Sequence, residues 1–319
     1  MTPDQRSDIT NGIWLCRNHS VIVDDDEVTY TADKLREMKR KHEQSRRFAP
    51  HIEGKARSDD IISVGGNIVA VGEFIGVDSS GWKARIKHFV IGAALDLISF
   101  ASDFAELSAD NRYVIMTELG DGRILSSAPS VTTNGSAYDV TFPIEPNHPR
   151  ISAQLLRSMA AHSETNDLVV KNGSWTMVSG LTALPQLIRM SLGFARGEGL
   201  FAQRWGTRIA EYYRDFAGSA WLQQLIKMEV IRAAAIPLAD QLSRTTKTPL
   251  QCVNRVVEVE VLADGLINQR PRTRIVLDVE GVGRWEHEIP VFVHTNEQLQ
   301  QITEGLNSQW AQSLRHQGF

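Results

Sequence analysis

The chain has 319 residues, of which 42% are hydrophobic and 23% charged, which is enough apolar material for one large core or two ordinary ones. Its net charge of -4 argues against polyanion binding through bulk charge, so any nucleic-acid contact must be local. Two widely separated cysteines, Cys16 and Cys252, argue against a disulfide framework and indicate a reducing compartment. The first residues do not show the basic-then-apolar pattern of a secretory signal, and no apolar run approaches the roughly 18 residues of a membrane span. We therefore expect a soluble, cytoplasmic protein without membrane contact.

The first informative motif runs from residue 10 to residue 21 and contains Asn11, Cys16 and His19. It resembles the second half of the HNH nuclease motif. In that family an asparagine orients the catalytic histidine, cysteines hold a structural zinc, and a last histidine binds the catalytic metal. The resemblance implies that Asn11 takes the place of the motif asparagine, Cys16 that of the first cysteine, and His19 that of the second.

The departures from this motif bear directly on catalysis. Ser20 stands where the family has its metal-binding histidine, and residues 1–10 contain neither cysteine nor histidine. A closed zinc site needs four N or S ligands, and a hydrolytic site needs an imidazole beside its metal. Cys16 and His19 supply two ligands, so we expect no catalytic residue and no required cofactor. Two alternatives stay open: zinc shared with another subunit, and a small buried cysteine beside a surface histidine with no metal.

The next segment is rich in basic residues at helical spacing. Residues 30–43 resemble the helix that closes many HNH-type units, and Leu35 and Met38 lie on one face of a helix predicted over 30–47. The candidate phosphate contacts on it are Lys39, Arg40, Lys41, Arg46 and Arg47. A solvated basic face that suits the helix dipole is the alternative interpretation. We assign 1–47 to a truncated HNH-like appendage and 48–60 to a linker.

Residues 61–150 are predicted to form a strand-rich domain. Alternating apolar residues flank the turn at Gly65-Gly66, and a helix is expected over 93–107. Further strands are expected around 82–90, 112–119, 123–128 and 138–144. Carboxylates gather beside the 112–128 hairpin, where they suit a hard cation or acid-base chemistry, although solvated loop carboxylates are the commoner case. The acidic residues are Asp110, Glu118 and Asp121, and Arg123 lies among them.

Residues 151–319 are predicted to form a second domain, of helices followed by an antiparallel sheet. A short helical piece is expected over 155–161, and the pair Glu286 and Glu288 should share one strand face opposite Trp285 and His287. The other predicted elements are strands at 168–170 and 174–178, helices at 184–192, 205–216 and 219–242, strands at 253–262, 273–279 and 284–293, and a helix at 296–314. The whole chain is therefore expected to be α+β.

A second resemblance lies in the loop between two of these helices. Gly197, Glu198 and Gly206 stand at the spacing of a signature of the small wedge proteins in contractile phage-tail baseplates, to which residues 180–295 are similar in element order. The resemblance implies a loop that contacts a partner. Its candidate contact residues are Glu198, Phe201, Trp205 and Arg208.

No nucleophile, base and acid come together with local support, no nucleotide fingerprint is present, and no small-molecule substrate is indicated. The first hypothesis is therefore a non-catalytic interaction or assembly protein, of a bacterial anti-phage defence or mobile-element system, whose HNH-like appendage docks on DNA or on a partner protein or second copy. The alternative is a metal-dependent HNH endonuclease whose true start lies upstream of Met1, with the missing ligands encoded there.

Overall fold

The structure, a computed structural model, describes residues 23, 31–37, 39, 60–198, 205–238, 247–262 and 267–305. The chain divides into two units, Met1–Arg57 and Ser58–Phe319. In the first unit, residues 32–37 are helical, and the N–H of Lys34 lies 3.4 Å from the hydroxyl of Thr31 at the start of the helix. A threonine in this position satisfies an otherwise free N–H group. This segment lies inside the helix predicted over 30–47.

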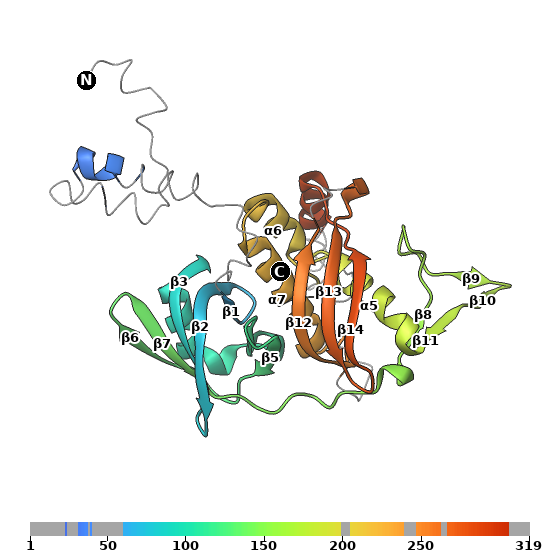
Figure 1. Cartoon of the computed structure of the whole chain (residues 1–319), viewed down its shortest axis with the longest axis horizontal. Coiled ribbons are helices and arrows are strands. Elements are labelled where there is room, and N and C mark those ends of the chain that lie inside the picture. The colour runs from blue at the N-terminus through green and yellow to red at the C-terminus, as the bar shows by residue number, and fades with distance from the viewer. Residues whose placement is uncertain are drawn as a thin grey trace, which may run out of the picture. The chain divides into compact units, whose positions relative to one another are not determined.

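Seven antiparallel strands form the larger sheet of the second unit, in the order β5-β4-β1-β2-β3-β7-β6 (Figure 1). The strands are β1 (Asp60–Val64), β2 (Ile68–Asp78), β3 (Gly81–Ile91), β4 (Tyr113–Met116), β5 (Asp121–Ile124), β6 (Ser130–Asn134) and β7 (Ala137–Phe142). Gly65 has a φ of +60° in the β1–β2 turn, which suits a residue without Cβ. The hairpin expected around Gly65-Gly66 is confirmed.

A three-stranded antiparallel sheet, in the order β12-β13-β14, forms the second layer of this unit (Figure 1). Its strands are β12 (Val253–Val261), β13 (Arg272–Val279) and β14 (Gly283–Pro290). The α-helices of the unit are α4 (Ala94–Ser102), α5 (Leu184–Gly193), α6 (Ile209–Phe216) and α7 (Trp221–Ala235), and residues 296–305 are also helical. Helices and antiparallel sheets together confirm the α+β class.

One hydrophobic core joins parts of the chain that we expected to form separate domains. Ile61 and Ile115, from the seven-stranded sheet, belong to the same buried cluster as Leu225 and Ile231 of α7 and Val256 of β12. Helix α7 contacts β1, β4, β5 and β12, and so packs against both sheets. Described residues from both the 61–150 and the 151–319 ranges therefore contribute to one core.

A second core lies on the opposite face of the seven-stranded sheet. Ile62 and Met116 point into it, and Phe100 of α4 covers it. Because both faces of the sheet are covered, β1 is buried at four consecutive positions, Ile61 to Val64. Burial on both faces explains why residues 61–64 are apolar apart from Ser63.

The outer face of the smaller sheet carries a charged network. The guanidinium of Arg274 lies 2.7 Å from Glu286, 3.2 Å from Glu260 and 3.4 Å from Glu258. On the other face, the rings of Trp285 and His287 stack with centroids 5.5 Å apart. The predicted alternation along this strand is confirmed.

Residues 155–161 do not form the predicted helix. The chain makes a 3-10 turn at Ala153–Leu155 and then strand β8 (Arg157–Met159). Leu156 is buried while Met159 is exposed, and the alternation from residue 157 onward has a period of two. A short apolar run is compatible with either period, and here pairing with a distant strand decides the outcome. None of the described helices is long and apolar enough to span a membrane.

Candidate functional site

Residues 157–179 form a small β-arm that Figure 1 shows standing out from the helices and sheet beside it. Besides β8, the arm contains β9 (Val170–Lys171), β10 (Ser174–Trp175) and β11 (Met177–Ser179). β8 pairs with β11, and β9 pairs with β10 across a turn in which Asn172 and Gly173 both have positive φ. Positive φ at both central residues is typical of a tight two-residue hairpin. The arm is therefore built from two small two-stranded sheets rather than an irregular loop.

The arm carries five large exposed apolar side chains, four of which the strand pairing places on the β8–β11 pair and on the β9–β10 pair. Met159 is paired with Met177, and Val170 with Trp175, while Leu168 is two residues from Val170 and so shares its face. All five are exposed, from 39% for Leu168 to 57% for Trp175. We call these five residues the outer face. An exposed apolar group of this kind on a folded unit is a signature of an interaction surface.

The backbone of the arm is fastened to helix α5. The Gln186 side chain accepts from the N–H of Ala161 at 2.8 Å and donates to the carbonyl of Met159 at 2.7 Å. One turn later, Arg189 donates to the amide oxygen of Asn166 at 2.9 Å. Because residues three apart share a helix face, both side chains reach the arm together. The backbone that carries the apolar outer face is thus hydrogen-bonded to α5.

Two of the candidate partner-contact residues, Glu198 and Trp205, have contacts within the described part of the chain. The carboxylate of Glu198 accepts from the N–H of Ala195 at 2.9 Å and lies 3.2 Å from Nε2 of His294. Burial raises the pKa of Glu198, but these two partners outweigh burial and leave the pKa below its usual range. The indole of Trp205 packs against the ring of Phe194, with centroids 5.1 Å apart. Phe201 lies outside the described residues.

Arg208, the fourth residue of that set, lies beside a buried carboxylate. Its guanidinium binds Glu211 at 2.6 Å. The backbone N–H of Arg208 lies 3.5 Å from the carboxylate of Glu229, which is fully buried. The same carboxylate accepts a hydrogen bond from the Tyr212 hydroxyl at 3.2 Å. Arg232 forms an ion pair with Glu229 at 3.2 Å. A buried charge needs such partners, so this network ties α6 to α7.

The carboxylates of the β4–β5 hairpin have structural partners. Asp121 accepts from Arg123 at 2.7 Å and from Asn147 at 3.0 Å, and Glu118 accepts from the N–H of Phe74 at 2.9 Å. Asp110 lies in a separate 3-10 turn, Ala109–Asn111. Within the described ranges, no three His, Cys, Asp or Glu side chains gather as they would around a metal ion.

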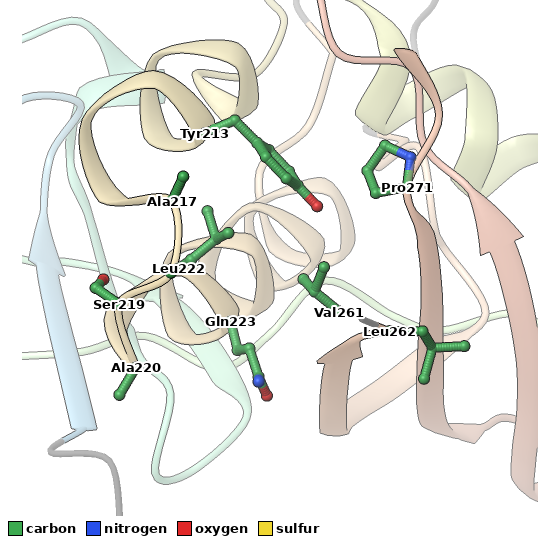
Figure 2. Close-up of a pocket in the computed structure, with 10 residues that line it drawn as sticks. Tyr213, Ala217, Ser219, Ala220, Leu222, Gln223, Val261, Leu262 and Pro271 are labelled. Carbon is green, nitrogen blue, oxygen red and sulfur yellow. The ribbon is translucent and has the colours of Figure 1, made fainter. Parts of the chain in front are cut away.

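A hollow of about 640 Å³ opens between the end of α6, the start of α7 and strands β12 and β13. Figure 2 shows the Tyr213 ring directed into it, toward Val261 and Pro271. Burial raises the pKa of Tyr213, and its hydroxyl has no hydrogen-bond partner among the described residues. The residues lining the hollow are apolar or uncharged, so it suits an uncharged group.

The HNH-like residues Asn11, Cys16 and His19 lie outside the described residues, as do Arg40, Lys41, Arg46 and Arg47; Lys39 is helical and half-buried.

Sequence reasoning missed the outer face of the arm. The signal for it was the pair of alternating segments around Leu168 and Trp175, joined by the Lys171-Asn172-Gly173 turn. Comparison with known protein families, curated proteins and solved structures finds no match to this chain.

Proposed function

We propose that this chain is a non-catalytic assembly protein that self-associates through the outer face of the arm and uses its N-terminal appendage as a second docking element. The observation that supports the first part is the outer face itself. Its five apolar side chains are exposed, while the backbone that carries them is bound to α5. Covering such a surface removes apolar area from water, which favours association.

The charge of the arm favours a second copy of the chain as the occupant. Its two basic residues, Arg157 and Lys171, are balanced by two acidic residues, Glu164 and Asp167. The five positions of the outer face carry no charge. A different partner is commonly selected by complementary charge, which this face lacks, whereas two identical faces meet without repulsion. A two-fold axis would bring the same face of both copies together.

The expected affinity is modest. Each half-exposed apolar side chain contributes on the order of 1 kcal/mol when it is covered, and association costs several kcal/mol of lost freedom. Self-association should therefore depend on concentration, with a Kd in the range of about 1 to 100 μM.

Sedimentation velocity over a concentration series tests this proposal. The wild-type chain should dimerise, and the double variant Trp175→Ser, Met177→Ser should stay monomeric at about ten times higher concentration. The matched control, Ile75→Ser with Val77→Ser, removes two similarly exposed apolar side chains from β2 and should dimerise as the wild type does. A wild-type chain that stays monomeric throughout, or an arm variant that dimerises normally, would refute self-assembly through the arm.

The second docking element is the HNH-like appendage, for which we propose DNA as the partner. The resemblance of residues 1–47 to HNH units supports this, and so does the surplus of basic residues after residue 38. HNH pieces circulate in bacterial anti-phage and mobile-element systems, which is where we place this protein.

Replacing Lys39, Arg40, Lys41, Arg46 and Arg47 by Glu should abolish DNA binding. Because each neutralised phosphate releases counterions, wild-type binding should also weaken steeply as salt is added. If these substitutions leave DNA binding at low salt unchanged, the proposal of DNA docking is refuted. The proposal for the arm does not depend on this result.

A further inference from the structure

A second hollow, of about 400 Å³, lies where the two sheets of the larger unit meet. It is lined by residues from β2, β3, β5 and the start of β12, together with Leu119. Its size falls in the lower part of the range of about 300 to 1,000 Å³ that small-ligand pockets occupy. None of the residues lining it belongs to the arm, so this site is independent of the proposed assembly surface.

The walls of the hollow are joined by hydrogen bonds. The N–H of Val256, in β12, donates to the carbonyl of Gly120 at 2.9 Å and so links the two sheets. The N–H of Phe74, in β2, donates to Glu118 at 2.9 Å. Strands β2 and β12 and the turn between β4 and β5 are thereby held around the hollow before any ligand arrives. Such preorganisation lowers the entropic cost of binding.

Two arginines give the hollow its positive side. Arg123 is oriented through its Nε by Asp121 at 2.7 Å, and its guanidinium lies over the ring of Trp82 at 5.6 Å from the centroid. Arg255 is exposed and forms no ion pair within the described part of the chain, while its aliphatic stem lies against Gly120. Asp121 balances the charge of Arg123, whereas the exposed guanidinium of Arg255 is available to an anionic ligand. Guanidinium groups match the oxygens of a phosphate.

The hollow also has an apolar part to its lining. Phe74 and Val77 line it, with Leu119 between the two sheets. Asn254 also reaches the hollow, and its amide nitrogen is engaged by Glu280 at 3.0 Å, which fixes the direction of the amide group. An aromatic ring beside guanidinium groups is a combination that stacks a base and binds the adjoining phosphate.

From this arrangement we propose that the hollow binds one nucleotide unit, with the phosphate against Arg123 and Arg255 and the base against Phe74. A free nucleoside monophosphate and the phosphorylated end of a single strand both carry a base next to a phosphate, so both fit this arrangement. The exposed guanidinium of Arg255 favours an anion, and the ring of Phe74 favours a flat body attached to that anion. Neither inorganic phosphate nor an uncharged nucleoside satisfies both walls.

Isothermal titration calorimetry with thymidine 5′-monophosphate tests this proposal on the full chain. Thymidine and inorganic phosphate should each bind at least tenfold more weakly than the monophosphate. Arg255→Gln should weaken the monophosphate about tenfold, as the loss of one charge-assisted contact does. The matched control, Arg284→Gln, removes an exposed arginine of β14 and should leave binding unchanged.

A 5′-phosphorylated oligothymidylate separates the two sources of the ligand. Tighter binding than the monophosphate, with the same loss in Arg255→Gln, would identify a strand end, and equal or weaker binding would identify the free nucleotide. No measurable binding at millimolar monophosphate would overturn the proposal. So would equal affinity for inorganic phosphate, or an Arg255→Gln variant that binds like the wild type. Because Arg255 is exposed, an unchanged circular dichroism spectrum in that variant would attribute the loss to binding.

Discussion

Gly120 and Val256 bring the two sheets of the larger unit into backbone contact. The N–H of Val256 donates to the carbonyl of Gly120 at 2.9 Å, and Gly120 has a φ of +64°. A Cβ added at Gly120 would lie 2.0 Å from the carbonyl oxygen of Val256, far closer than atoms can approach. Only glycine satisfies both the backbone conformation and the approach of β12.

Replacing this glycine by alanine should therefore destabilise the unit strongly. We expect Gly120→Ala to lower the free energy of unfolding by at least about 3 kcal/mol, from left-handed strain plus the displaced strand. Urea denaturation followed by circular dichroism measures the loss. The control is Gly135→Ala, at a φ of +62° with open space around the position, where strain alone should cost about 1 kcal/mol. Equal losses in the two variants would show that the close contact between Gly120 and Val256 contributes nothing to the free energy of unfolding.

The buried carboxylate of Glu229 should matter more for stability than any surface ion pair of this unit. Glu229→Gln keeps the shape but removes the negative charge that faces Arg232, at 3.2 Å, and the Tyr212 hydroxyl. Leaving a mostly buried guanidinium without its counterion should cost about 3 kcal/mol. The control, Glu211→Gln, breaks the more exposed pair with Arg208 and should cost at most about 1 kcal/mol. Comparable losses in urea denaturation would contradict this ranking.

The predictability of the fold follows from how locally each element is determined. The β1–β2 hairpin has apolar strand residues on both sides of the Gly65-Gly66 turn, so the sequence is sufficient to predict it. By contrast, β6 (Ser130–Asn134) is polar and mostly exposed, and it becomes a strand only because β7 pairs with it. Strand β8 has the same dependence on β11.

The candidate site was less predictable than the fold, because it depends on what is left uncovered. Trp175 and Met177 have the pattern of a strand that faces a core, and nothing in the sequence says that no element covers them. The hollow between the two sheets is lined by Phe74, Arg123 and Arg255, which are far apart along the chain. Only the pairing of the two sheets brings such residues together, and local periodicity carries no information about it.

The attachment of the arm to α5 should control the local stability of the arm and little else. Gln186→Ala removes the acceptor of the Ala161 N–H, at 2.8 Å, and the donor to Met159. Amide hydrogen exchange at Ala161 should accelerate about tenfold, because this hydrogen bond is what protects the group. The thermal midpoint should fall by only a few degrees. Gln154→Ala, an exposed glutamine of the neighbouring 3-10 turn, should leave exchange at Ala161 unchanged.

The thiol of Cys252 should make the unit less stable as the pH rises into the alkaline range. Burial raises its pKa from 9.0 to about 11, since the thiolate is poorly solvated inside the core. Between these two values the unfolded chain loses the proton while the folded chain retains it. The stabilisation is therefore complete below pH 9 and is lost as pH rises toward 11.

Comparison with Cys252→Ala isolates this effect from the other groups that titrate in the same range. The difference in free energy of unfolding between wild type and variant, from urea denaturation, should shrink by about 2 kcal/mol between pH 8 and pH 10.5. Tyrosines and lysines affect both proteins equally, so they cancel in the difference. A difference that stays constant over this range would mean that the thiol ionises alike in both states, which a side chain with no exposed surface does not permit.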